Sequence, residues 1–228
     1  MFNPFEAAVF YFIFLFSTTL HEAAHAWAAM RGGDLTAYRG GQVSINPLPH
    51  IRREPFGMVV LPVLSVIFSG WPLGFASTPY DPAWARLHPK RAALMSLAGP
   101  AANLSLVLVT ALLIRLFLGY GFFSAGRSSM AHLVIAEGSG WESLAFVLSV
   151  FFSMNLILFA LNILPVPPLD GSGVLPMFLG RDYSMRLQEV FAQPIVAMMG
   201  MIIVWRGFSS IFRPIFHFAV DLLFRGLL

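Results

Sequence analysis

The sequence has 228 residues, of which 57% are hydrophobic and 11% are charged, and its mean hydropathy is +0.75. Soluble domains carry about 25% charged residues. With 11%, this chain cannot cover itself with a water-facing surface, so its composition excludes a soluble globular domain and predicts a protein embedded in a lipid bilayer. The formal net charge of +3 comes from scattered basic residues with no stripe of interleaved aromatic side chains, which argues against binding to nucleic acid.

Apolar runs along the chain predict an all-α polytopic membrane protein with about six transmembrane or re-entrant helices, because about 20 apolar residues cross a bilayer. The runs are Phe5–Met30, Phe56–Phe68, Ala92–Leu118, Leu144–Ile163, Val190–Trp205 and Ile211–Leu228. The first run lacks a positively charged leader and a small-residue cleavage site, so we expect it to be kept as a span. Polar connections are expected at 119–140 and 170–186.

The first apolar run contains the sequence HEAAH at residues 21–25. Two histidines four residues apart project from one face of a helix, so His21 and His25 can bind one zinc ion. A glutamate beside the first histidine can take a proton from water, which makes Glu22 a candidate general base. The alternative is a chance pattern near the end of a span. A charged residue at the centre of a span costs about 2.5–3.5 kcal/mol, so the motif favours a metal site.

Residues 31–75 are expected to form a short β element and a re-entrant helix. The stretch GGQVSINPLP at 40–49 shows brief alternation of polar and apolar residues, which predicts an edge strand. The run Phe56–Phe68 is short, contains Pro62 and precedes a turn-forming sequence, so it is a tilted or a re-entrant helix. A re-entrant helix would keep the arginine-rich connections on either side of it at one membrane face, as the positive-inside rule prefers.

The fourth apolar run closes with LNILPVPPLDG at 161–171, where three prolines in four positions end the helix. Irregular backbone at membrane depth is tolerated only where it is buried in protein or lines a wet cavity. A catalytic zinc needs a third protein ligand, and Asp170, which this irregular segment delivers and a permissive glycine follows, is the candidate. Asp-Gly is also a common turn pair, and from spacing alone a ligand and a turn outside the membrane are equally good interpretations.

Three sequence blocks together resemble the site-2 protease family of intramembrane zinc metalloproteases. The blocks are HEAAH at 21–25, GPAAN at 99–103 and NILPVPPLDG at 162–171. The resemblance implies one membrane-embedded metalloprotease domain at 1–228, similar to compact family members without a PDZ domain. Its parts would be an HExxH helix at 5–30, a β and re-entrant region at 31–75, a GxxxN helix at 92–118, the NxxPxxPLDG helix and turn at 144–173, and C-terminal helices at 190–228.

The resemblance also implies a role for each candidate residue. The implied ligands of one zinc ion per chain are His21, His25 and Asp170. Glu22 would activate water, and Asn162 would contact the oxyanion or the substrate backbone. Asn103 would contact the substrate or support the site. Gly99, in the same block as Asn103, is equally well explained as part of a small-residue packing face.

The resemblance implies an enzyme that hydrolyses peptide bonds within or near transmembrane segments of other membrane proteins. The substrate would be a single-pass membrane protein, and the enzyme a multi-pass protein of a bacterial plasma membrane. The loops at 50–57 and 70–76 depart from the pattern of compact members, so substrate engagement can differ. One alternative is a zinc transporter, which the absence of repeat halves disfavours. The other is a non-catalytic binder of the same fold, which the intact metal and base residues disfavour.

Overall fold

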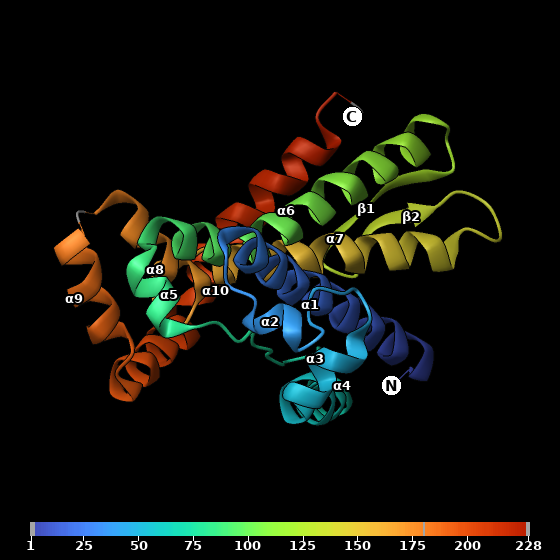
Figure 1. Cartoon of the computed structure of the whole chain (residues 1–228). Helices are drawn as coiled ribbons and strands as arrows, with labels where there is room; N and C mark the ends of the chain where they lie inside the picture. Colours follow the sequence, from blue (N-terminus) through green and yellow to red (C-terminus); the bar gives the residue numbers. More distant parts are fainter. Residues whose placement is uncertain (1–2, 180, 227–228) are drawn as a thin grey trace.

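A computed structural model describes residues 3–179 and 181–226 of the chain (Figure 1). This part of the chain contains four helices that are long and apolar enough to cross a membrane. They are α1 (Pro4–Gly32), α6 (Pro89–Gly119), α7 (Glu142–Asn162) and α10 (Pro194–Phe224). At about 1.5 Å per residue, each of them is long enough to cross the roughly 30 Å hydrocarbon layer, and α1, α6 and α10 extend beyond it. The chain is therefore an all-α polytopic membrane protein, as its composition predicts.

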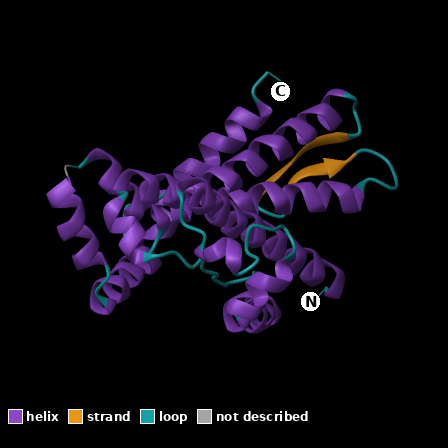
Figure 2. Ribbon diagram, in the orientation of Figure 1, coloured by secondary structure: helices purple, strands orange, loops and turns teal. Residues whose placement is uncertain are grey.

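Shorter elements connect the long helices, and Figure 2 shows that they are helical apart from one hairpin. The helical ones are α2 (Thr36–Arg39), α3 (Pro47–Arg53), a π-helical turn η1 (Phe56–Val60), α4 (Leu61–Ser69), α5 (Pro82–Leu87), α8 (Asp170–Val174), a 3-10 turn η2 (Leu175–Phe178) and α9 (Arg181–Phe191). The hairpin pairs β1 (Phe123–Ser129) with β2 (His132–Ala136) in antiparallel orientation. The polar connections predicted at 119–140 and 170–186 are thus largely structured.

Helices α1, α6 and α7 pack against one another and form the centre of the protein (Figure 1). One apolar cluster joins Phe14 of α1 to Met154 of α7 and Val66 of α4. A second joins α6, α7 and the hairpin to α10 through side chains such as Phe152 and Phe216. The most apolar window of α7 is 61% buried and that of α10 only 17%, so α10 lies at the edge of the bundle with most of its surface available to lipid.

The segment from η1 to α5 lies along α1. The hydroxyl of Tyr11, in the first half of α1, donates to the carbonyl of Met58 in η1 at 3.4 Å, whereas Asp81, just before α5, lies beside Asp34 at the other end. Helix α4 and the turn before it are shorter than a span, and the chain then returns in an extended conformation. Where it returns, the hydroxyl of Ser77 donates to the carboxylate of Glu54 at 2.6 Å. The backbone N–H of Asp81 donates to Asp34, just beyond the end of α1, at 2.8 Å. Residues before and after α4 thus lie side by side, which is the arrangement expected of a re-entrant helix.

The edge strand predicted at 40–49 is wrong. Pro47 opens the helix α3 there, and the side chain of Asn46 caps it by accepting the backbone N–H of Leu48 at 3.0 Å. Asparagine at the N-cap followed by proline at the first helical position is a strong helix start, and it outweighs alternation over a few residues. Within residues 3–179 and 181–226 the β structure is the hairpin between α6 and α7, so the short β element follows the first helix, as predicted, but not at 40–49.

The hairpin lies against α7 (Figure 1). Leu133 and Val134 of β2 are buried, and their backbone N–H groups lie 3.1 Å and 3.3 Å from the hydroxyl oxygen of Ser149 on α7. Backbone groups away from water need an internal partner. Ser149 provides one, so this polar side chain inside an apolar span attaches the hairpin to the helix bundle.

The two C-terminal runs predicted at Val190–Trp205 and Ile211–Leu228 form one continuous helix, α10. The polar stretch at 206–210 separates the runs in sequence, but polar side chains do not interrupt the backbone hydrogen bonds of a helix. Pro214 lies inside α10, which transmembrane helices tolerate when neighbouring groups satisfy the freed carbonyl. At the far end, the guanidinium of Arg115 on α6 donates to the carbonyl of Leu223 at 2.8 Å. The described part of the chain thus has fewer long apolar helices than the sequence predicted.

Candidate metal and catalytic site

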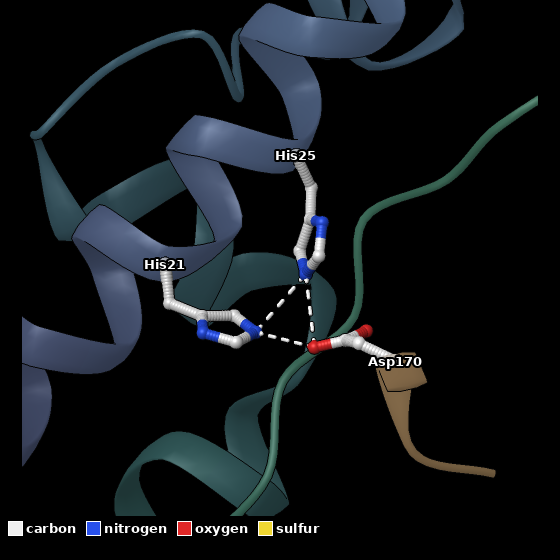
Figure 3. Close-up of side chains that lie close together, drawn as sticks. All are labelled: His21, His25 and Asp170. Carbon is white, nitrogen blue, oxygen red and sulfur yellow. Dashed lines mark hydrogen bonds and ion pairs between the residues drawn. The ribbon is translucent and has the colours of Figure 1, made fainter. Parts of the chain in front are cut away.

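Two histidines of α1 and an aspartate at the start of α8 converge between the central helices (Figure 3). The Nε2 atoms of His21 and His25 lie 3.0 Å apart. Oδ2 of Asp170 lies 3.0 Å from Nε2 of His21 and 3.3 Å from Nε2 of His25. Both histidines are buried and Asp170 is partly buried. The structure thus brings together the three ligands predicted from the sequence, although Asp170 is distant from the histidines along the chain.

The second ring nitrogen of each histidine faces a hydrogen-bond acceptor. Nδ1 of His25 lies 2.7 Å from the carbonyl oxygen of Met95, so this nitrogen carries the proton. Nδ1 of His21 lies 2.6 Å from Oδ1 of Asn103, and the amide nitrogen of Asn103 donates to Asn155. The amide oxygen of Asn103 therefore faces His21 as an acceptor, and Nδ1 of His21 also carries the proton. Both Nε2 atoms therefore present lone pairs toward the carboxylate. Two imidazole lone pairs and a carboxylate that face one another form a donor set for a cation such as zinc.

Gly99 of α6 leaves the space that such a cation needs. A Cβ at this position would lie 2.6 Å from Nε2 of His21 and closer still to Nε2 of His25. Oδ2 of Asp170 is a buried oxygen to which no described group donates a hydrogen bond. Gly99 therefore faces the site as well as allowing α6 to approach α1, and the residues present fit a zinc ion.

The turn between α7 and α8 carries Asp170 to the histidines. A Cβ on Gly171 would collide with the carbonyl oxygen of Ile163, so this turn accepts only glycine beside the aspartate. Helix α10 approaches the turn as closely, because a Cβ on Gly200 would collide with the carbonyl oxygen of Pro167. The turn is therefore tightly packed and holds Asp170 beside both histidines, as a ligand role requires.

Glu22 lies beside His21 on α1 and is 5% exposed. Its Oε2 accepts a hydrogen bond from the hydroxyl of Thr78 at 2.7 Å. Thr78 belongs to the extended segment that returns from α4, and sequence reasoning missed it because no motif singles it out. The structure thus supplies the candidate base with a partner from outside the HEAAH helix.

Asn103 is completely buried behind His21. Its amide nitrogen donates to Oδ1 of Asn155 at 3.0 Å, and Asn155 donates to the hydroxyl of Ser17 at 3.0 Å. This polar chain joins α6, α7 and α1. Of the two roles that the resemblance implies for Asn103, this geometry favours support of the site over contact with substrate. Sequence reasoning missed Asn155 and Ser17, although polar residues inside apolar spans are a usable signal.

Asn162 is the last residue of α7. Its side-chain N–H donates to the carbonyl of Leu158, one turn earlier, at 3.0 Å. In the part of the chain that the structure describes, no hydrogen bond joins Asn162 to the three converging side chains. Its predicted contact with an oxyanion stays a prediction.

Comparisons with known proteins agree on one family. A sequence profile of peptidase family M50 matches residues 9–206. YwhC of Bacillus subtilis, named as a candidate zinc metalloprotease, is 28% identical over 217 residues, which cover 87% of this chain and 90% of that protein. Rip2 of Mycolicibacterium smegmatis, named likewise, is 33% identical over 171 residues, 74% of this chain and 56% of that protein. Rip2 of Mycobacterium tuberculosis is 30% identical over 161 residues. The chain spans about half the length of the Rip2 proteins. No solved structure matches it significantly.

Proposed function

Because the chain belongs to peptidase family M50, we propose that it is an intramembrane zinc metalloprotease that hydrolyses peptide bonds within or near transmembrane segments of membrane proteins. The observation that carries the proposal is the convergence of His21, His25 and Asp170, with Glu22 beside them, among helices long enough to span a membrane. A metal transporter or a non-catalytic binder needs no glutamate between two histidine ligands.

One zinc ion per chain would be held by Nε2 of His21, Nε2 of His25 and Oδ2 of Asp170. Two histidines and a carboxylate are a known ligand set of catalytic zinc sites, which keep a further position open. Zinc bound there would supply a Lewis acid that polarises the scissile carbonyl and makes water easier to deprotonate. The bonds from Nδ1 of each ring to Met95 and Asn103 fix the ring orientations and increase the basicity of Nε2.

Glu22 would act first as a general base and then as a general acid. Its carboxylate takes a proton from the attacking water as the new C–O bond forms. It then gives that proton to the leaving nitrogen as the C–N bond breaks. Asn162 would donate to the oxyanion through the second N–H of its side-chain amide, because the first donates to the carbonyl of Leu158.

A cavity of about 390 Å³ lies against the turn that carries Asp170 and would admit water. Its lining includes Met95 of α6, Ser172 of α8 and Arg86 of α5, together with residues of α9. Arg31 and Arg91, whose guanidinium donates to the carbonyl of Gly32 at 3.1 Å, lie at the C-terminal end of α1, so the positive-inside rule would assign this end to the cytoplasmic face. The substrate would be a single-pass protein of a bacterial plasma membrane, unwound near that face because helical carbonyls are already hydrogen-bonded.

The proposal is tested with purified protein in liposomes that contain a single-pass model substrate. We expect cleavage that a chelator abolishes and added zinc restores. Glu22→Gln should keep zinc but lower the rate by about 10²–10⁴-fold, the usual contribution of a general base. Asp170→Ala should lose zinc. Undiminished cleavage by Glu22→Gln would contradict the role of the base, and zinc flux without cleavage would indicate a transporter.

A further inference from the structure

The carboxylate of Glu22 is held by a residue that lies far from the HEAAH helix in sequence, and we infer that Thr78 is a positioning residue for the catalytic base. The inference rests on the proposed function. A carboxylate only accepts, so the Thr78 hydroxyl is the donor in the 2.7 Å contact with Oε2 of Glu22. Within residues 3–179 and 181–226, no other group donates a hydrogen bond to this carboxylate. Thr78 therefore selects one orientation of a side chain that could otherwise take several rotamers.

The location of Thr78 is fixed on both sides. Just before it, the hydroxyl of Ser77 donates to Glu54 at 2.6 Å, which ties the segment to the start of the re-entrant helix. Just after it, the backbone N–H of Asp81 donates to Asp34 at 2.8 Å, which ties the segment to the end of α1. The donor thus stands on anchored backbone, which a residue that positions a catalytic group requires.

The Thr78 hydroxyl has a second acceptor within reach. The backbone carbonyl oxygen of Glu22 lies 2.9 Å from the same hydroxyl oxygen. A hydroxyl has one proton and donates to one acceptor at a time. When the Glu22 carboxylate turns toward water, the hydroxyl can donate to the carbonyl and is not left unpaired. Thr78 can therefore hold the carboxylate between turnovers and release it during one.

Three threonine variants of the zinc-loaded full chain, in liposomes with a single-pass model substrate, separate positioning from a structural role. Thr78→Val keeps the shape and removes the hydroxyl, whereas Thr78→Ser keeps the hydroxyl. The control is Thr110→Val, because Thr110 is a threonine at least as buried as the partly buried Thr78, and its hydroxyl donates to the carbonyl of Leu106 on α6 at 2.7 Å.

We expect Thr78→Val to lower kcat by about 10- to 100-fold, the usual effect of a misplaced catalytic group. KM, zinc content and the unfolding temperature should be unchanged. Thr78→Ser should restore kcat, and Thr110→Val should behave as the wild type.

Unchanged kcat in Thr78→Val would overturn the inference, and so would failure of Thr78→Ser to restore it. A joint fall of kcat, zinc content and unfolding temperature in Thr78→Val would also overturn it, since that result indicates a structural role. Absence of zinc-dependent cleavage by the wild type would overturn the proposed function and the inference with it. Wild-type cleavage with an unaffected Thr78→Val would overturn the inference alone.

Discussion

Replacing Gly99 by alanine tests whether the space between the two histidine rings is a metal site. The new Cβ would lie 2.6 Å from Nε2 of His21 and closer to Nε2 of His25, whereas non-bonded atoms prefer about 3.5–4.0 Å. The rings cannot simply retreat, because Asn103 and Met95 hold their Nδ1 atoms at 2.6 Å and 2.7 Å. Either a ring must leave its partner, or α6 must move away from α1.

The expected effect on zinc is larger than the effect on folding. Alanine is about 0.8–1.0 kcal/mol better than glycine inside a helix, and overpacking costs about 1–3 kcal/mol, so the two terms partly cancel. Loss of a bond that orients a metal ligand lowers affinity by about 10- to 100-fold, and here both ligand atoms are also crowded. We therefore expect zinc affinity to fall by about 100-fold or more, which corresponds to roughly 2.7 kcal/mol.

Competition with a colorimetric zinc chelator in detergent measures the affinity, and thermal unfolding of the metal-free protein measures the fold. Gly207→Ala is the control, because Gly207 lies inside α10 and a Cβ there would meet nothing within 4 Å. The control should bind zinc as the wild type does. Wild-type affinity in Gly99→Ala would refute the reasoning, since it would show that the ion does not occupy the space beside this glycine.

Two further predictions concern the surroundings of the site. Asn103→Ala should weaken zinc binding by about 10- to 100-fold in the same titration, and unchanged affinity would show that His21 needs no orienting partner. Burial would raise the pKa of Asp34, but hydrogen bonds from the Thr36 hydroxyl and from the backbone N–H groups of Asp81 and Thr36 hold it below its ordinary value of 3.8. This stabilisation is complete above the ordinary value and is lost as the pH falls through the lowered pKa of the folded state. The difference in unfolding temperature between wild type and Asp34→Asn should therefore shrink on acidification below about pH 4, and a constant difference would contradict the assignment.

Local signals in the sequence were sufficient to predict those parts of the site that lie on a single helix or turn. The spacing of His21 and His25 is a property of a helix, and the run of prolines before Asp170 ends α7 without reference to other parts of the chain. That Asp170 meets the histidines depends on how α1, α6 and α7 pack, which spacing does not encode. The choice between ligand and turn therefore needed the resemblance first and the structure afterwards. Thr78 carried no signal, because its function depends on where a re-entrant segment returns.

The wrong predictions have physical causes as well. At 40–49 the alternation pattern is short, and the helix start at Asn46 and Pro47 overrides it. The hairpin at 123–136 lies in a stretch that the sequence identified only as polar. At 206–210 the drop in hydropathy suggested a break, but α10 continues because its backbone bonds are independent of side-chain polarity. Side-chain hydropathy locates apolar surface and does not by itself locate the ends of helices.

The hydrogen-bonded chain from Ser17 through Asn155 and Asn103 to His21 makes the orientation of one histidine depend on three helices at once. A nascent chain whose α7 has not yet docked lacks Asn155 as the partner of Asn103, and His21 is then less firmly oriented. The packing of the bundle and the geometry of the site are therefore coupled through these four side chains.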